Sequence, residues 1–301
     1  MRQSRFDIHQ HITAAILKAI DAGPGDFHLP WHRSAGAIMR PRNALTEKSY
    51  QGVNILGLWA QADVAGFSAG LWATFKQWHE LGASVRKGAK ASYVVFYKEY
   101  AAPDADEAPA DGDAPALRRV ARATPVFAAE QVDGFTIPVS PLPQPAQPVE
   151  AQEAADAFVA ATAAQILHAG QRAFYRPADD TITLPPRETF VGSPTSTPTE
   201  AYYATLLHEL THWTAPASRC NRELGKRFGD AAYAAEELIA ELGAAFLCAD
   251  LSVSNVPRPD HAQYLNSWLS LLKADSRAIF AASAKASEAV AYLQDLARPR
   301  G

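Results

Sequence analysis

The chain has 301 residues, and its 48% hydrophobic and 20% charged content is typical of a globular protein with one or two buried cores. It contains no run of about eighteen apolar residues and no N-terminal apolar stretch of signal-peptide length, so we expect a cytoplasmic protein without a membrane span. Its two cysteines, Cys220 and Cys248, form no CxxC pair, which excludes a cysteine-type zinc site and suits a reducing compartment.

Charge is unevenly distributed along the chain, although the net charge is only −4. Residues 1–100 hold 12 Lys and Arg against 7 Asp and Glu, whereas residues 101–117 hold 5 acidic residues and no basic one. A basic block is a weak indication of a polyanionic partner, and a solvated surface that happens to be positive explains it equally well.

The first part of the chain is predicted to contain two helical segments separated by a loop. Isoleucines recur at every fourth position over residues 8–20, and Gly23 follows, which indicates an amphipathic helix that ends at a glycine. Residues 24–54 are rich in Pro, Gly and Asn and predict a loop. Residues 55–81 predict a mostly helical segment with a break at the glycines between positions 66 and 70.

Two strands and two segments of biased composition come next. Tyr93–Tyr97 is β-branched and aromatic, and Val120–Phe127 is its expected partner strand. The segment 101–117 has almost nothing to bury, so we expect it to be a disordered excursion. The Pro-rich stretch 138–149 predicts a linker. The resulting division of the chain is a first domain, 1–137, and a second domain, 150–301.

The second half is predicted to be mostly helical, with a small sheet. One helix is predicted to end at Gly170, because four residues before it share a face: Phe158, Thr162, Ile166 and Ala169. Thr181–Leu184 is a strand candidate. The fold class is therefore α+β, with a small α+β N-terminal domain followed by a mostly helical domain.

Four further helices are predicted after this strand. The string Thr-Pro-Thr-Glu at 197–200 is a capping box with proline at the first helical position, and the helix that it opens must stop before Pro216. A long helix is predicted from about Ala231 to Asp250. Two more helices follow, the last one rich in alanine.

The helix that the capping box opens carries the string His208-Glu209-Leu210-Thr211-His212. His208 and His212 lie four residues apart, so both imidazoles face the same way and can hold one metal ion. Glu209 lies beside them and can serve as general base toward a water on that metal. This is the HExxH pattern of metallopeptidases. Two alternatives stay open: ordinary helix residues, or a metal that is structural and cleaves nothing.

A third ligand is expected from the next helix, because catalytic zinc usually takes three protein ligands. That helix contains Glu236, Glu237 and Glu241 among apolar residues. Buried carboxylates are unfavourable unless they have a partner, so we expect these residues to bind a metal or a polar group. We assign Glu237 as the third ligand and expect Glu241 to hold a ligand histidine by its other ring nitrogen. The alternatives are Glu241 or Glu236 as the ligand. One divalent ion is implied: zinc suits this set best, and manganese also binds such N/O sites.

Two arginines follow the HExxH helix, Arg219 and Arg222. They either stabilise charge at the site or pair with nearby acidic residues, and we favour the pairing. Asp179 and Asp180 are interpreted as surface-turn residues.

Aromatic, amide and basic residues alternate in the first domain, a pattern that suits single-stranded DNA, whose bases stack while its phosphates meet Lys and Arg. The alternative is that Trp72, Phe75 and Trp78 form the core of a small domain, which must hold for at least one of them. The candidate DNA contacts are Trp31, Arg40, Arg42, Asn43, Tyr50, Asn54, Trp72, Lys76, Gln77, Arg86, Lys87 and Lys90.

Several strings carry a resemblance to a known family. In the first half they are Pro-Arg-Asn-Ala and Tyr-Gln-Gly-Val-Asn within 41–54, Trp-Ala-Thr-Phe-Lys-Gln at 72–77, and Gly-Ala-Ser-Val-Arg-Lys-Gly at 82–88. In the second half they are His-Glu-Leu-Thr-His-Trp-Thr at 208–214 and Tyr-Ala-Ala-Glu-Glu-Leu-Ile-Ala-Glu at 233–241. Together they resemble plasmid antirestriction proteins of the ArdC type, whose first module is also similar to the N-terminal part of TraC-type primases.

This resemblance implies a single-stranded DNA-binding domain joined to a zincin-like metallopeptidase domain. It implies a role in conjugation, where a plasmid enters the recipient as single-stranded DNA and must survive host restriction. It carries the metal ligands onto His208, His212 and Glu237, and it implies no particular peptide substrate. A host restriction enzyme or another DNA-bound protein is the expected protein partner. A pure DNA-binding module and a metallopeptidase without a nucleic-acid role are the alternatives.

Overall fold

The computed structural model describes residues 7–21, 39–101, 117–138, 153–191, 197–223, 231–253, 268 and 272–298. Trp31, most of the acidic segment and most of the predicted linker lie outside these residues, so the expectations made for them stay predictions. The described residues combine helices with small sheets, which confirms the α+β class.

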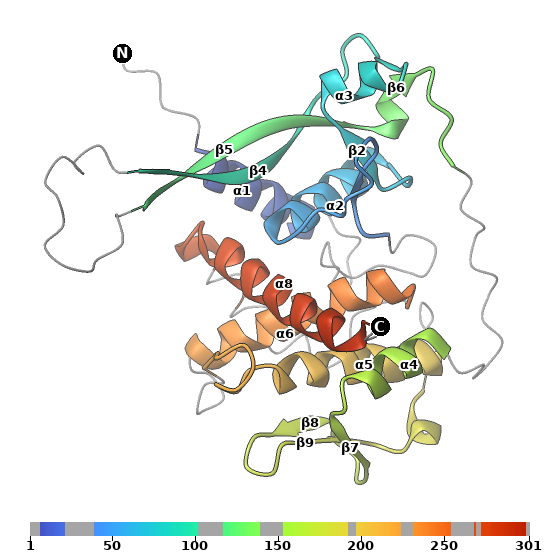
Figure 1. Cartoon of the computed structure of the whole chain (residues 1–301), viewed down its shortest axis with the longest axis vertical. Coiled ribbons are helices and arrows are strands. Elements are labelled where there is room, and N and C mark those ends of the chain that lie inside the picture. Colours follow the sequence, from blue (N-terminus) through green and yellow to red (C-terminus); the bar gives the residue numbers. More distant parts are fainter. Residues whose placement is uncertain are drawn as a thin grey trace, which may run out of the picture.

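The first half is built on a four-stranded sheet that packs against two helices, α1 (Ile8–Asp21) and α2 (Val53–Ala65) (Figure 1). The predicted first helix is confirmed, and so are the two predicted strands, which are longer than expected. The strands of the sheet are, in spatial order, β1 (Arg42–Asn43), β2 (Leu71–Ala73), β5 (Leu117–Ala128) and β4 (Ser92–Ala101).

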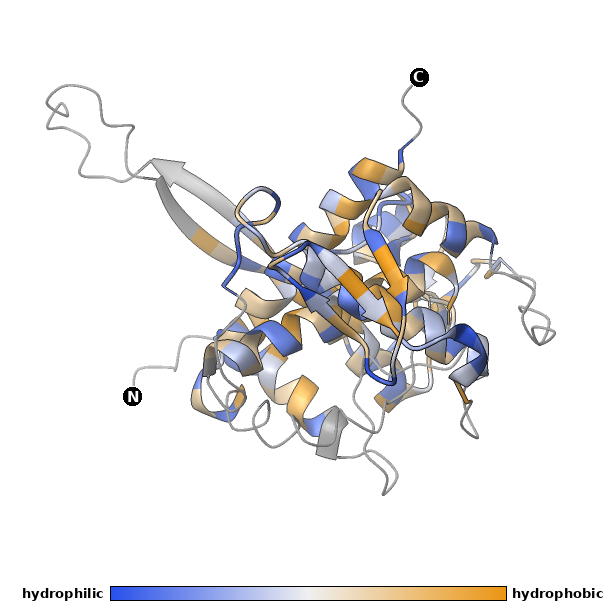
Figure 2. Cartoon of the chain, turned by 90° about the horizontal axis from the view of Figure 1, so that it is seen from below, coloured by the Kyte–Doolittle hydropathy of each residue, from blue (hydrophilic) through white to orange (hydrophobic). Residues whose placement is uncertain are grey.

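Strands β4 and β5 form a long antiparallel hairpin that projects from the body in two perpendicular views (Figures 1 and 2). The outer edge of β4 is covered at its base by Asn54 of α2. The Asn54 Nδ2 donates to the carbonyl of Val95 at 2.9 Å, and the Val95 N–H donates to Asn54 Oδ1 at 2.7 Å. Because a free strand edge invites pairing with other chains, this amide closes part of an exposed edge.

The prediction of helix over 55–81 with a break near Gly66 and Gly70 is confirmed, but the strand β2 after the break was not predicted. Helix α2 ends at Gly66, whose φ of 71° is the left-handed conformation that glycine adopts most readily. The chain then forms β2, because Trp72 and Ala73 pair with residues of β5 more than fifty positions away. A local sequence pattern does not reveal such a long-range pairing.

After β2, the chain forms a small lobe with its own core. It consists of α3 (Phe75–Glu80), β3 (Ser84–Val85), a 3₁₀ turn at Ala129–Gln131 and β6 (Val132–Asp133). Trp78 is fully buried at the centre of this lobe, and its indole N–H donates to the carbonyl of Phe127 at 3.0 Å. The lobe therefore rests on the sheet through one tryptophan and a few small apolar residues.

A three-stranded sheet occupies the far end of the second half (Figure 1). Its spatial order is β7 (Gln165–His168), β9 (Thr181–Leu184) and β8 (Phe174–Arg176), with β7 and β9 parallel. Thr181–Leu184 is thus confirmed as a strand. A 3₁₀ turn at Arg187–Thr189 follows β9.

The helix predicted to run to Gly170 is wrong beyond its first part, since α4 spans only Glu153–Ala161. The Thr162 hydroxyl donates to the carbonyl of Val159 at 2.7 Å, and Ala163 then takes a positive φ of 57°, which turns the chain out of the helix. Ile166 instead pairs with Ile182 in the sheet. The apolar residues that mimicked a helical face are therefore shared between a helix and a strand.

Three long helices complete the second half: α5 (Pro198–Trp213), α6 (Ala231–Leu251) and α8 (Ala278–Ala297). The predicted capping box at the start of α5 is confirmed, because the Glu200 N–H donates to the Thr197 hydroxyl at 3.2 Å and the Glu200 carboxylate accepts from the Thr197 N–H at 2.7 Å. Helix α6 packs against both α5 and α8. The predicted long helix and the final alanine-rich helix are confirmed as well.

The two halves share one continuous hydrophobic core. Trp59 of α2 contacts Phe246 of α6, with ring centroids 6.0 Å apart. The Gly52 N–H donates to the Ser287 hydroxyl of α8 at 2.9 Å. The helices of the first half therefore lie directly on the helical layer of the second (Figure 1).

None of the helices in the described part of the chain combines the length and the apolar character needed to cross a membrane. Figure 2 shows hydrophilic residues distributed along the helices, between the apolar residues that pack inward.

Candidate metal centre

Helix α5 brings the two histidines of the HExxH string to one buried face. His208 and His212 are one turn apart, and their imidazoles are almost fully buried. Their Nε2 atoms lie 3.2 Å from one another. Soon after His212 the helix ends, and the Thr214 hydroxyl there donates to the carbonyl of Thr211 at 2.7 Å. The predicted face of the helix is therefore the one that points into the protein.

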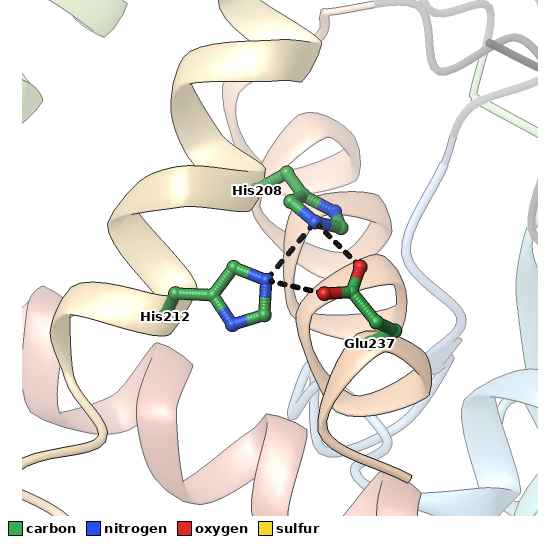
Figure 3. A group of neighbouring side chains, drawn as sticks. All are labelled: His208, His212 and Glu237. Atoms are coloured by element: carbon green, nitrogen blue, oxygen red, sulfur yellow. Dashed lines mark hydrogen bonds and ion pairs between the residues drawn. The ribbon is translucent and has the colours of Figure 1, made fainter. Parts of the chain in front are cut away.

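Helix α6 places the carboxylate of Glu237 opposite both histidines (Figure 3). One carboxylate oxygen lies 3.5 Å from His208 Nε2 and the other lies 3.6 Å from His212 Nε2. The three side chains offer ligand atoms that all lie within 4.8 Å of one another. Two histidines and one carboxylate in this arrangement match the donor set of a divalent metal site with positions left for water or substrate.

The polarity of the three groups favours a cation. The His212 Nδ1 lies 3.2 Å from a carboxylate oxygen of Glu236, so Nδ1 is the nitrogen that donates and Nε2 presents a lone pair. This lone pair and the carboxylate of Glu237 converge beside His208 Nε2 in a buried space, an arrangement that a positive partner stabilises.

The electrostatics of Glu237 agree with a role as ligand. Burial by itself would raise the pKa of this carboxyl, but hydrogen bonding from His208 and the attraction of both histidines outweigh burial and lower the pKa to about 2. Glu237 is therefore ionised at neutral pH, as metal coordination requires.

The outer nitrogens of the histidines face two further acidic residues of α6. His208 Nδ1 lies 3.7 Å from Glu241, the residue expected to hold a ligand histidine in this way. The shorter contact, at 3.2 Å, joins His212 and Glu236, which the sequence suggested only as an alternative ligand. The helical wheel separates Glu236 from Glu237 but does not reveal that His212 lies between their carboxylates.

Glu209, the candidate general base, lies next to His208 on α5 and is 6% exposed. No hydrogen bond or ion pair joins its carboxylate to another residue in the described part of the chain. A carboxylate that is not tied to a neighbour keeps its lone pairs for a proton. This environment is the one that the expected role requires.

The separation between the two metal-binding helices is set by Gly243 of α6. A Cβ atom at this position would lie 2.5 Å from the Cγ2 and 2.7 Å from the hydroxyl of Thr211, which is fully buried on α5. Only glycine lets the two backbones approach this closely. Because Gly243 belongs to the helix that carries Glu237 and Thr211 to the helix that carries both histidines, this contact limits how closely the ligands of the two helices can approach.

Residues 153–285 match a family described as a zincin-like metallopeptidase. Residues 6–127 match a second family, the N-terminal domain of the anti-restriction factor ArdC. The two matched segments lie on either side of the predicted linker.

Proteins of known sequence and structure extend both matches over the whole chain. An uncharacterised protein of Sinorhizobium fredii, y4eC, is 43% identical over 95% of this chain and 91% of its own length. The crystal structure of metal-free ArdC from the R388 plasmid is 36% identical, with a TM-score of 0.79 over 97% of this chain and 98% of that one. The chain belongs to the ArdC family of antirestriction proteins. The Mn(II)-bound crystal structure of R388 ArdC gives a TM-score of 0.74 at 35% identity, with 98% of this chain and 100% of that one covered.

The same residues are related to a larger plasmid protein. The DNA primase TraC of Escherichia coli is 36% identical over 95% of this chain, but the match spans only 20% of the primase. The ArdC-type unit is thus one part of that protein.

Four of the predicted DNA-contact residues of this ArdC-family chain are buried: Arg40, Tyr50, Asn54 and Trp72. Arg40 forms an ion pair with Asp250 of α6 at 2.5 Å, and Asn54 covers the edge of β4. Trp72 is 1% exposed and packs against Phe67. In this conformation the four side chains hold the fold, and a buried indole offers no face to a base.

Five other candidates are exposed and carry positive charge: Arg42, Lys76, Arg86, Lys87 and Lys90. Asn43 and Gln77 are partly buried and hydrogen-bonded to each other at 3.1 Å. Phe75, one of the three aromatic residues considered as core, is 61% exposed beside Lys76. The capping box formed by Thr74 and Gln77 was the available signal, because it places Phe75 at the first, outward position of α3.

Proposed function

We propose that this ArdC-family protein binds single-stranded DNA that enters a recipient during plasmid conjugation and protects that DNA from host restriction, with a divalent-metal centre that hydrolyses peptide bonds of a DNA-associated host protein. The observation that carries the peptidase part is the convergence of His208, His212 and Glu237 beside the buried carboxylate of Glu209.

We assign His208, His212 and Glu237 as the ligands of one divalent ion. Zinc suits this donor set, and the Mn(II) in R388 ArdC makes manganese the second candidate. Glu236 and Glu241 would hold the outer ring nitrogens, so that both histidines present Nε2 to the metal.

The chain's own residues supply the remaining chemistry of hydrolysis. A bound metal would polarise the scissile carbonyl and acidify the attacking water. Glu209 accepts the proton that this water loses as its oxygen bonds to the carbonyl carbon, and then delivers the proton to the amine nitrogen as the C–N bond breaks. Burial keeps competing bulk water away from Glu209.

The DNA-binding part of the proposal rests on the ArdC-type N-terminal domain and on the exposed cations of the small lobe. Lys76 lies in α3, and Arg86, Lys87 and Lys90 lie in the segment that follows β3. Phe75 adds an exposed ring that a base can stack on. Phosphate contacts by such residues give affinity without sequence preference.

The decisive experiment incubates the protein with candidate host restriction and DNA-bound proteins, single-stranded DNA, and zinc or manganese, and detects fragments by gel and mass spectrometry. Glu209→Gln is the matched control, because it keeps the side-chain size and the metal ligands but cannot accept the proton. Fragments from the wild type alone support the peptidase. If neither metal yields fragments while DNA is still bound and protected, the protein is a DNA-binding module with a silent metal domain.

A second experiment tests the DNA surface. The double variant Arg86→Ala, Lys87→Ala is expected to bind single-stranded DNA more weakly. Its association constant should also depend less steeply on salt concentration: the magnitude of the slope of log K against log salt concentration should decrease by about 0.7 for each phosphate that the variant no longer neutralises. Lys285→Ala is the control, because Lys285 is an exposed, Glu288-paired lysine on α8. If the double variant has the same DNA affinity and the same salt dependence as the wild type, Arg86 and Lys87 do not contact DNA. If the wild type itself binds no DNA, the result favours a metallopeptidase without a nucleic-acid role.

A further inference from the structure

Arg222 occupies an unusual position for a charged residue, because its side chain is only 3% exposed at the end of the turn that follows α5. The turn folds back on the helix: the Arg222 N–H donates to the carbonyl of Ala215 at 2.7 Å, and the Cys220 N–H donates to the carbonyl of Thr214 at 2.9 Å. Asn221 takes a positive φ of 48°, a conformation that asparagine tolerates better than most residues. The backbone therefore delivers Arg222 to the C-terminal end of the helix that carries the histidines.

The guanidinium of Arg222 joins that helix end to α6. Its Nη2 donates to the carbonyl of Thr211 at 2.8 Å, and its Nη1 donates to the Thr214 hydroxyl at 2.7 Å. Its Nε and Nη2 donate to the two carboxylate oxygens of Glu236 at 3.0 and 2.9 Å. This is the bidentate fork that arginine forms with a carboxylate and that lysine, a point charge, does not reproduce.

The carboxylate held in this way is the one that faces His212. The same Glu236 oxygen that accepts from Arg222 Nη2 lies 3.2 Å from His212 Nδ1. Guanidinium, carboxylate and imidazole thus form one chain of hydrogen bonds in a space where Glu236 is also only 3% exposed. A buried ion pair contributes little net stability, because the cost of desolvation opposes the attraction. We therefore interpret the Arg222–Glu236 pair as a contact that fixes the position of the Glu236 carboxylate.

We propose that Arg222 is a positioning residue of the metal centre: it fixes Glu236 so that His212 keeps its proton on Nδ1 and aims the lone pair of Nε2 at the metal. The inference rests on the proposed metal site and deepens it, since it extends the centre to a residue outside both metal-binding helices. Without Arg222, the Glu236 carboxylate loses its fork, and the ring of His212 loses its fixed orientation.

The test compares Arg222→Met and Arg222→Lys with Arg219→Met in the full chain. Arg219 is the matched control, because it is a neighbouring, mostly buried arginine that pairs with Asp180 at 2.5 Å and lies over the ring of Trp213, away from Glu236. Zinc and manganese affinities are measured by competition titration. Arg222→Met should lose about 10- to 100-fold in affinity, as outer partners of metal ligands typically do. Arg222→Lys should lose less, and Arg219→Met should stay within about twofold of the wild type.

A second readout does not depend on metal. Long-range ¹H–¹⁵N NMR of the metal-free proteins reports which ring nitrogen of His212 carries the proton. We expect Nδ1–H in the wild type and in Arg219→Met, and a mixture of tautomers in Arg222→Met. If Arg222→Met keeps both the wild-type affinity and the wild-type tautomer, the proposal is overturned. If the wild type itself binds no metal, the proposed function fails, and the tautomer still decides whether Arg222 positions His212.

Discussion

The charge on Glu237 determines what the buried centre can hold. Its carboxylate and the Nε2 atoms of the two histidines meet within 3.6 Å, and all three are acceptors when each neutral imidazole carries its proton on Nδ1. A divalent ion turns this repulsion into three coordination bonds. Binding of the ion should therefore stabilise the fold, by about 2.7 kcal/mol when the free metal is a hundredfold above Kd.

The variant Glu237→Gln separates the two states of this centre. At about pH 8, where histidine is ordinarily neutral, the amide N–H can donate to an Nε2 lone pair, so the metal-free variant should melt above the metal-free wild type. Added zinc or manganese should raise the melting temperature of the wild type and leave the variant unchanged. A wild type whose melting temperature does not respond to metal or to a chelator would contradict the assigned ligand set.

At the scale of elements, the site depends on how closely α5 and α6 approach. Gly243 and Thr211 lie at their contact, and the same two helices carry the ligands. Neither residue touches the candidate metal position, yet together they determine whether Glu237 reaches both histidines. The helix spacing is thus as much a part of the centre as its ligands are.

The substitution Gly243→Ala tests this spacing. The new methyl would clash with Thr211 and push the helices apart, so we expect a loss of about 1–3 kcal/mol in the free energy of unfolding, together with weaker metal binding. Gly57→Ala in α2 is the control, because its Cβ would make only an ordinary 3.6 Å contact with Ile12, and it should be neutral or slightly stabilising. Adding Thr211→Ala should restore metal affinity to Gly243→Ala. Full affinity in Gly243→Ala alone would show that the helices can shift without harm to the site.

At the scale of the whole molecule, we expect the two halves to unfold as one unit, because their apolar residues form one core. Arg40 of the first half and Asp250 of α6 form an ion pair across the contact, and Gln294 of α8 donates to the same carboxylate at 2.8 Å. Burial raises the pKa of Asp250 and Arg40 opposes this effect, with a net pKa above the ordinary value. Ionisation of Asp250 therefore opposes folding as the pH rises through its pKa, and Arg40 limits the loss.

The substitution Arg40→Met should destabilise both halves together, by about 1–3 kcal/mol at neutral pH, because it leaves a buried carboxylate without its cation. The loss should shrink as the pH falls through the raised pKa of Asp250, because protonation removes the unpaired buried charge. Urea unfolding followed by tryptophan fluorescence and by far-UV circular dichroism measures both halves. Arg298→Met, which removes an exposed pair with Asp295, should have no measurable effect. Separate transitions for the two signals would show that the modules fold independently.

The sequence by itself determined several features of this protein that depend on neighbouring residues. The capping box at Thr197, the histidine spacing on α5 and the extents of α1 and α6 follow from local rules of helix geometry, and the structure contains them as predicted. The family resemblance rests on such strings too. Where local pattern misled, at Ile166 and in the segment after α2, a strand forms through pairing with distant residues.

Only the tertiary structure determined which side chains of different elements face one another. It brought Glu236 to His212 and Arg222 to Glu236, and it buried Arg40 and Trp72. Each of these depends on the angle and distance between elements, which arise from packing of the whole core and leave no signature in adjacent residues. The sequence therefore named the metal-binding side chains, while the fold chose the groups that orient them.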